Sequence, residues 1–394
     1  MQTNTHQARV LRRQGAVAVL RHVHAHPAAT RADVIRVLGL SSGSATDITA
    51  RLKRLRLLDE AGSPPTGERG RPSPMLVPHP DGPVVCAVDI SHERWRISVA
   101  ELGGGVVEQA SGRHATRRPD AVLGHLRETV NGVYQRYPGR LGAVSVAVAG
   151  TVRGTDVVQA AGLRWRNVSL ESLRIQPGMP LLVGNDATLA GLAEARRGAG
   201  ARARVVLHLI VAVGVGGTLV VDGTPVDGTT GAGGEFGHLP FGDPGRSCPC
   251  GARGCWDLEV GGRAMARLLG EPPPRNPRTR AEQVIATAAV DPAARLAVQA
   301  TARALGRGIG GLVNATDPDV VTLSGLAVEI MQSAPGELES SYRAALMRFH
   351  RSSPPALTTT TLGSHSQLTG AVDRGFDAVL TPDGLDAWSG RAVP

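Results

Sequence analysis

Apolar residues recur at helical spacing over the first part of the chain and predict three helices. The helices are expected at about residues 7–24, at 31–38 and from residue 42 onward. Thr30 suits the N-cap of the second helix, and Gly39 suits its C-terminal end. The buried side of the third helix is expected to carry residues three or four apart, namely Ala45, Ile48, Leu52 and Leu55. Two helices joined by a short glycine-containing turn are typical of a helix-turn-helix.

Turn-forming residues dominate the segment after the third helix, which ends in a short apolar run. Residues 61–72 are rich in glycine and proline, and Met75 to Val77 then predict a strand. A hairpin wing fits this pattern. Within it, Arg69 and Arg71 lie in an Arg-Gly-Arg-Pro run similar to arginine arms that enter narrow minor grooves. A plain linker is an equally good interpretation of this run.

From residue 83 onward, buried strands alternate with helical stretches. Alternation of this kind is typical of a two-lobed α/β protein. The strands are expected at residues 84–90, 96–100, 143–148, 181–183, 205–213 and 219–221.

Length and composition bound the class of protein. With 394 residues and 42% hydrophobic side chains, two or three globular domains are expected. No apolar run of about 18 residues occurs, and the first residues lack the apolar segment of a secretory signal. We therefore expect a soluble, cytoplasmic protein with no membrane partner.

Positive charge is concentrated at the N-terminal end. Residues 1–80 contain twelve basic and five acidic side chains, a net charge of +7 out of +9 for the whole chain. Such an excess is typical of a module that binds nucleic acid, although a winged helix that docks a protein is the alternative. The expected DNA-binding residues are the small polar and basic ones of the third helix and the arm: Ser42, Ser44, Thr46, Thr49, Arg51, Lys53, Arg54, Arg69 and Arg71.

Four potential metal ligands lie close together in the middle of the chain. They are His238, Cys248, Cys250 and Cys255, which include three of the four cysteines. Thiolate and imidazole are ligands that zinc prefers, and three cysteines with one histidine make a closed structural set. Disulfides and unrelated buried thiols are the alternatives, but three cysteines cannot all pair within one chain. The sequence thus predicts a structural zinc ion.

The same segment resembles a known protein family. Residues 235–238 read Glu-x-Gly-His, and residues 248–257 read Cys-x-Cys-Gly-x-x-Gly-Cys-x-Asp. The run is similar to the sugar motif and zinc loop of the ROK family (repressors, open reading frames and sugar kinases), except that Asp257 replaces a glutamate. The resemblance implies an α/β fold: a winged helix-turn-helix, then an actin-like, RNase H-like pair of sugar-binding lobes. The expected domains are the DNA-binding head with wing and linker at 1–80, lobe 1 at 81–185, and lobe 2 with the zinc loop and C-terminal helix at 186–394.

Asn185 and Asp186 follow a predicted strand and precede a helical stretch. An amide and a carboxylate at a strand's carboxyl end suit hydrogen bonds to sugar hydroxyls, and an aspartate there could also act as a base or as an N-cap. The resemblance implies that the pair binds a hexose and that Asp186 matches the base of the kinases. It also implies sugar contacts by Glu235, His238 and Asp257.

Two glycine-rich phosphate loops of the kinases are altered in this chain. The first is similar to Asp-x-Gly-Gly-Thr-Lys in the kinases and reads Asp-Ile-Ser-His-Glu-Arg at 89–94. The second is similar to Gly-Thr-Gly-Ile-Gly and reads Ala-Val-Gly-Val-Gly at 212–216. Phosphate loops need glycine so that backbone N–H groups can approach the anion. In addition, Gly162 stands where the kinases have an asparagine, which removes a potential hydroxyl contact.

These observations favour a sugar-responsive, DNA-binding transcriptional regulator, specifically a repressor, and not an enzyme. Its expected partners are an operator duplex, a sugar or sugar derivative, and further copies of the chain in a homodimer or homotetramer. An ATP-dependent sugar kinase is the alternative, because Asp186 is retained. A scaffold, or a regulator that needs no ligand, is the third hypothesis.

Overall fold

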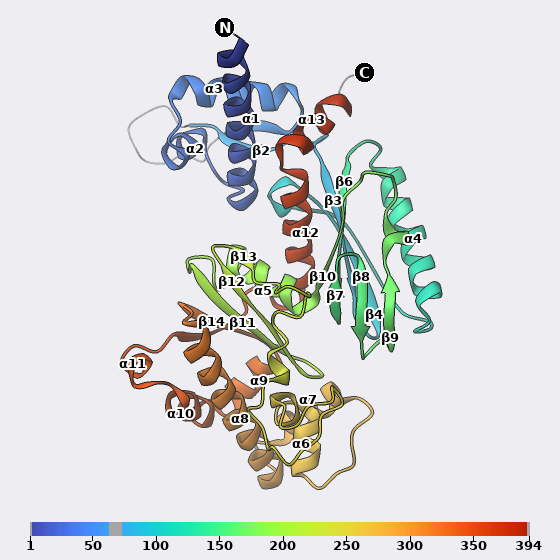
Figure 1. Ribbon diagram of the computed structural model, residues 1–394, viewed down its shortest axis with the longest axis vertical. Helices are drawn as coiled ribbons and strands as arrows, with labels where there is room; N and C mark the ends of the chain where they lie inside the picture. Colours follow the sequence, from blue (N-terminus) through green and yellow to red (C-terminus); the bar gives the residue numbers. More distant parts are fainter. Residues whose placement is uncertain (1, 63–72, 392–394) are drawn as a thin grey trace. The chain divides into compact units, whose positions relative to one another are not determined.

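The computed structural model describes residues 2–62 and 73–391 and divides the chain into two compact units (Figure 1). The first unit contains Met1–Asn185 together with Ala371–Pro394, and the second contains Asp186–Gly370. The prediction that residues 186–394 form one lobe is therefore wrong at its C-terminal end. Residues 371–394 pack with the first unit, because their helices bury apolar and polar side chains against the head, as described below.

The N-terminal head consists of three helices and a two-stranded sheet. These elements are α1 (Gln2–Ala25), α2 (Arg31–Leu38), α3 (Ser42–Arg54), β1 (Leu58–Ala61) and β2 (Met75–Pro78). β1 and β2 pair antiparallel, as a wing requires, and the residues between 63 and 72 lie outside the described part of the chain. The head is consistent with the winged helix-turn-helix predicted from the sequence.

Local capping fixes the two short helices of the head. The Oγ1 of Thr30 accepts a hydrogen bond from the backbone N–H of Asp33, and the Asp33 carboxylate accepts one from the backbone N–H of Thr30. Gly39 ends α2 in the left-handed conformation with φ 62°. Ser41 caps α3 by accepting from the N–H of Ser44 at 3.1 Å. Both predicted ends of the second helix are confirmed.

The rest of the first unit is built on a five-stranded sheet with the order β10-β6-β3-β4-β5. Strands β3, β6 and β10 are parallel to one another, whereas β4 and β5 are antiparallel additions. A second, three-stranded sheet has the order β7-β8-β9. The bounds are β3 (Val84–Ile90), β4 (Arg94–Glu101), β5 (Val106–Arg113), α4 (Pro119–Arg136), β6 (Leu141–Val148), β7 (Thr151–Arg153), β8 (Asp156–Ala160), β9 (Trp165–Ser169) and β10 (Leu181–Asn185), with short 3₁₀ turns at η1 (Leu102–Gly104) and η2 (Glu171–Leu173).

Two C-terminal helices complete the first unit. They are α12 (Ser366–Val379), which belongs to this unit from Ala371 onward, and α13 (Pro382–Arg391). The indole Nε1 of Trp388 donates to the carbonyl oxygen of Leu55 at 2.8 Å, and Arg21 donates to the carbonyl oxygen of Leu380 at 3.0 Å. Gly375 packs against Val85 of β3 so closely that a side chain there would collide with it. The head is thus joined to the C-terminal helices by direct contacts.

The second unit contains another five-stranded sheet, with the order β13-β12-β11-β14-β15. Its strands are β11 (Val205–Val211), β12 (Val215–Val221), β13 (Thr224–Pro225), β14 (Val320–Gly325) and β15 (Ala356–Thr359). Its helices are α5 (Asp186–Arg197), α6 (Gly262–Leu268), α7 (Pro277–Thr287), α8 (Pro292–Thr316), α9 (Leu326–Ser333), α10 (Pro335–Ala345) and α11 (Arg348–Arg351), with 3₁₀ turns at η3 (Phe236–His238), η4 (Trp256–Leu258) and η5 (Gly363–His365).

The core of the second unit lies between its sheet and helices α7 to α10. Leu207, Leu323, Leu305 and Tyr342 are among its fully buried members. Burial of this apolar surface is the main favourable term in the folding of the unit. Among the described residues, no helix combines the length and the apolar character that crossing a membrane requires.

Candidate functional site

The four predicted metal ligands come together in the second unit. One ligand atom from each of His238, Cys248, Cys250 and Cys255 lies within 4.8 Å of the others. The Nδ1 of His238 is 3.9 Å from the Sγ of Cys248, and the Sγ atoms of Cys250 and Cys255 are 3.6 Å apart. Three sulfur donors and one nitrogen donor thus lie close enough together to surround a single ion, and four such donors are the usual set of a structural zinc site.

The cysteine loop has a backbone that is shaped to enclose an ion. Gly251 and Gly254 have φ values of 98° and 69°, which side-chain-bearing residues rarely adopt. The amide of Cys248 donates to the carbonyl oxygen of Ala252 at 2.8 Å and closes the turn. The donor set and the loop geometry therefore fit zinc, with the three cysteines and His238 as its ligands.

The thiols of this cluster affect one another. Burial and the neighbouring thiols raise the pKa of Cys255 to about 12, whereas a hydrogen bond from the Ala252 backbone lowers the pKa of Cys250. A bound divalent cation would favour all three thiolates. Cys86 differs because burial, with a smaller effect of the Glu108 carboxylate, raises its pKa to about 12, and it is not part of the cluster. It is a packed thiol of strand β3.

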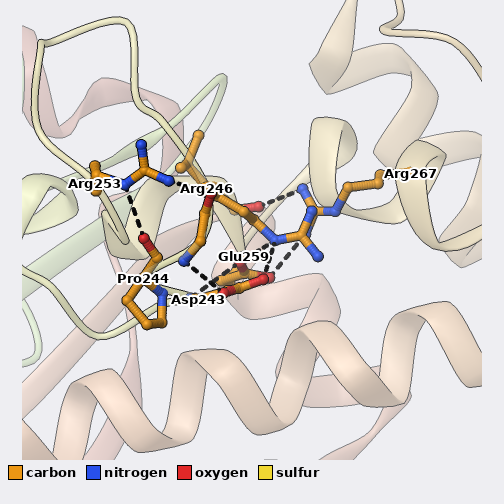
Figure 2. Close-up of polar contacts among 8 residues, drawn as sticks. Asp243, Pro244, Arg246, Arg253, Glu259 and Arg267 are labelled. Carbon is orange, nitrogen blue, oxygen red and sulfur yellow. Dashed lines mark hydrogen bonds and ion pairs between the residues drawn. The ribbon is translucent and has the colours of Figure 1, made fainter.

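A network of charged residues surrounds the cysteine loop and was not predicted from the sequence. Figure 2 shows Arg246 between two carboxylates, with its Nε 3.2 Å from Asp243 and 3.1 Å from Glu259. Arg267 approaches the second Glu259 oxygen at 2.8 Å, and Arg253 donates to the carbonyl oxygen of Pro244 at 3.1 Å (Figure 2). These charged residues are spread over the 25 positions from 243 to 267, so no short sequence motif predicts their contacts.

The two ring nitrogens of His238 face different groups. Its Nδ1 is directed at the cysteines, and its Nε2 is 4.0 Å from the Oε2 of Glu235. Glu235 immediately precedes the 3₁₀ turn η3, which ends at His238, and this turn brings the two side chains close together. A metal ion on Nδ1 would leave Nε2–H to donate to a ligand or to Glu235.

The side chain of Asp257 binds a backbone amide of the segment 212–216, the second glycine-containing loop compared above with the kinases. Its Oδ1 accepts a hydrogen bond from the N–H of Val215 at 2.6 Å, and Gly214 lies so close that any side chain there would collide with the carboxylate. Burial raises the pKa of Asp257, and the bond from Val215 opposes this shift. The position is fixed by Trp256, whose indole lies against Gly308 and donates to Ala304 at 2.9 Å.

The first altered loop is closed on itself. The N–H of Ser91 donates to the carbonyl oxygen of Arg94 at 3.0 Å, and the Ser91 hydroxyl donates to the same oxygen at 2.9 Å. Asp89, before the loop, is buried and pairs with Arg96 at 2.8 Å. Burial raises the pKa of Asp89, although the Arg96 guanidinium opposes the shift. The β3–β4 turn is therefore a compact hairpin turn without the open row of amides that a phosphate cradle needs.

Asn185 and Asp186 lie on either side of the boundary between the two units. Asn185 ends β10, and its Nδ2 donates to the carbonyl oxygen of Gly150 at 2.9 Å within the first unit. Asp186 begins α5, and its Oδ1 accepts from the N–H of Ala187 at 2.9 Å within the second. The predicted strand and helix are both confirmed, and Asp186 also contributes at the helix N-terminus.

The predicted DNA-contacting residues of α3 differ in accessibility. Ser42, Ser44, Thr46 and Arg54 are exposed and Arg51 is half-buried. Thr49 is not available, because its side chain is buried and its hydroxyl donates to the carbonyl oxygen of Ala45 at 2.7 Å. Its inclusion was wrong. The Lys53 ammonium lies 3.2 Å from Asp59 and 3.3 Å from Glu60, and Arg69 and Arg71 lie outside the described residues.

Comparison with known proteins establishes the family. The ROK family model matches residues 85–374, and the chain belongs to the ROK family. The structure is similar to a crystal structure described as a ROK family transcriptional regulator, homolog of the E. coli MLC protein. The TM-score is 0.78 at 22% identity, and the match covers 96% of this chain and 99% of that one. The two chains therefore share their fold over nearly their whole length, including the N-terminal head.

Curated relatives include both repressors and kinases. A xylose repressor from Bacillus subtilis is 21% identical over 83% of this chain and 87% of its own length. A glucokinase from Streptomyces coelicolor is 27% identical over 70% of this chain and 95% of its own length. The match to the repressor therefore extends over more of this chain than the match to the kinase.

Proposed function

We propose that this protein is a sugar-responsive, DNA-binding transcriptional regulator, a repressor that a sugar or sugar derivative releases from its operator. Residues 1–80 form the DNA-binding head, and Asn185, Asp186, Glu235, His238 and Asp257 contribute to the sugar site. A structural zinc ion is held by His238, Cys248, Cys250 and Cys255. Ser42, Ser44, Thr46, Arg51, Lys53 and Arg54 supply the DNA contacts of α3, with Arg69 and Arg71 in the wing.

The hydrogen bond from the Val215 amide to the Asp257 carboxylate is the main structural argument against ATP binding, and so against a kinase. A phosphate loop offers free backbone amides to an anion, but here the carboxylate already accepts the amide of Val215 at 2.6 Å. A phosphate would have to displace this charge-assisted bond, worth roughly 1.5–3 kcal/mol. It would then also sit beside a second anion. The closed Ser91–Arg94 turn removes the other cradle.

The head supports a role on DNA. Its charge of +7 is most of the +9 of the chain, and α3 follows α2 through a short turn that includes the left-handed Gly39. Exposed Ser42, Ser44 and Thr46 lie at the start of α3, where a recognition helix reads base edges. A homodimer would place two such heads on a palindromic operator, a helical turn or a multiple apart.

For a sugar to release the repressor from its operator, the sugar must bind more tightly to a conformation that cannot bind DNA. Asn185 is the last residue of β10 and Asp186 is the first residue of α5, so a sugar that engages both side chains would contact a strand and the helix that directly follows it. His238 would link the sugar site to the zinc loop through its two nitrogens. The protein would be an intracellular regulator of carbohydrate use.

A coupled ADP-release assay with the full-length protein separates the regulator from the kinase. We expect no turnover of ATP with D-glucose, D-xylose or N-acetylhexosamines, while calorimetry detects binding of at least one sugar that Asp186→Asn weakens. The kinase alternative is favoured by one observation, the retention of Asp186 at the start of α5. Turnover that is abolished by Asp186→Asn would establish that alternative and overturn the proposal.

A further inference from the structure

Three parallel strands of the first unit end at the same edge of its sheet. In the order β10-β6-β3, Asn185 pairs with Val148, and Val148 pairs with Ile90. In open α/β sheets, ligands bind outside the carboxyl ends of such strands. Asn185 of the proposed sugar site and the turn after Ile90 therefore belong to one edge.

Direct contacts connect the loops along this edge. The Nδ2 of Asn185 donates to the carbonyl oxygen of Gly150, and the neighbouring amide of Ala149 donates to the carbonyl oxygen of Ile90 at 3.2 Å. Gly150 in turn packs against Ala160 at the end of β8, where a Cβ on Gly150 would lie 2.7 Å from that of Ala160. The β8–β9 turn is thus held next to the same edge.

His92 occupies the space beside Gly162 in that turn. A Cβ on Gly162 would lie 2.9 Å from the Cβ of His92, closer than such atoms approach in folded proteins. The absence of a side chain at 162 is therefore what permits His92 to sit there. The imidazole is about one-third exposed (32%), and its Nε2 is 3.5 Å from the Oε1 of Glu93.

We propose that His92 is a specificity-determining residue of the sugar site, and that Gly162 is its necessary counterpart. This inference rests on the proposed function, because it assigns a new contact to the same site. His92 lies in the turn that follows Ile90, at the edge that bears Asn185, and its imidazole carries a hydrogen-bond donor and an acceptor, with its Nε2 next to the Glu93 carboxylate. These are the properties that discriminate one sugar hydroxyl from its epimer or from its absence.

The test is a binding titration of the full-length protein with a panel of neutral monosaccharides that includes D-glucose and D-xylose. His92→Ala removes the imidazole and should weaken the best ligand by roughly threefold to tenfold, the usual effect of one hydrogen bond. It should also change the ratio of affinities across the panel, since only sugars with the contacted hydroxyl lose a bond. His125→Ala, on the nearby helix α4, is the matched control and should leave all affinities unchanged.

A second pair of variants tests the coupling between the two positions. Gly162→Ala should weaken binding because its Cβ displaces His92. In His92→Gly, which removes the colliding Cβ, the same change should have little further effect. Equal losses for every sugar in His92→Ala, or simple additivity of the two changes, would overturn the role of His92. If the unaltered protein binds no sugar of the panel, the proposed function fails first, and this inference with it.

Discussion

The Nε2 of His24 lies 3.0 Å from the Oδ1 of Asp373, and both side chains are buried. His24 is near the end of α1 in the head, whereas Asp373 is on α12, 349 positions later in the chain. The backbone N–H of Gly103 donates to the Nδ1 of the same ring at 3.0 Å. Because Nδ1 accepts, Nε2 carries the hydrogen and donates to the carboxylate. One imidazole thus connects the head, the sheet region and the C-terminal helix.

His24→Ala should therefore lower the free energy of unfolding of the first unit by about 2 kcal/mol, since it leaves the buried Asp373 carboxylate and the Gly103 amide without this partner. It should also loosen the head from the rest of the unit. Denaturant unfolding monitored by circular dichroism checks the first expectation, and hydrogen exchange at α1 checks the second. His26→Ala is the control, because His26 is exposed on the same segment. Equal losses in the two variants would show that the His24 contact adds nothing.

Cys250→Ser should release the metal and destabilise the second unit. A structural zinc site contributes its binding energy to folding, and three remaining ligands hold the ion less well. Elemental analysis of the purified protein measures the metal content, and thermal unfolding measures the stability. Cys86→Ser is a useful comparison: it disturbs a buried thiol of β3 but should retain the full metal content. Metal retained by Cys250→Ser would contradict the assignment of the ligands.

Arg51→Ala should weaken binding to duplex DNA and flatten its dependence on salt. A side chain that contacts phosphate releases a counterion, so its loss lowers the salt slope by about one for each bound copy. Fluorescence anisotropy at several salt concentrations gives the slope. Arg343→Ala, on α10 of the second unit, should leave it unchanged, because Arg343 pairs with Glu339 there. An unaltered slope in Arg51→Ala would remove this residue from the DNA-contacting surface.

His208 makes the stability of the second unit depend on pH. The ring is fully buried on β11 between Thr322 and Ser324, and burial lowers its pKa from 6.5 to about 4. Below pH 6.5 the unfolded chain binds a proton that the folded chain refuses, so stability is complete above that pH and falls as the pH drops toward 4. The loss should be on the order of 3 kcal/mol.

Denaturant unfolding at pH 7, 5.5 and 4.5 measures this loss, and His208→Gln is the matched variant. Glutamine keeps a donor and an acceptor for the two hydroxyls but does not titrate. The variant should be less stable at neutral pH and should lose less on acidification. Parallel pH profiles for the two proteins would mean that another group is responsible.

Local features of this fold could be predicted from the sequence, whereas contacts between distant segments could not. Thr30 and Gly39 act on residues within one helical turn, and their roles follow from residue type and spacing. The pairing of His24 with Asp373 and the bond from Val215 to Asp257 depend on how distant segments pack, which no spacing along the chain encodes.

Two errors have specific physical causes. Thr49 was expected on the DNA side because it is polar, but its hydroxyl is satisfied by the carbonyl oxygen of Ala45 and its methyl group is buried. A C-terminal helix was expected as part of lobe 2, but the sequence does not show which unit such a helix packs against, and α12 from Ala371 onward and α13 belong to the first unit. The cluster of His238, Cys248, Cys250 and Cys255, by contrast, could be predicted from the sequence because a short loop brings all three cysteines together.

The central claim is that occupancy of the sugar site controls binding of the head to DNA. The most direct measurement uses a fluorescent duplex that the full-length protein selects from a random pool, with anisotropy followed during titration of the sugar that most stabilises the protein against heat. The account predicts that the anisotropy falls to the value of free duplex as the sugar site fills, and that Asp186→Asn shifts this release to higher sugar concentration. Duplex that stays bound when the sugar is saturating, or a protein that selects no duplex, would contradict it.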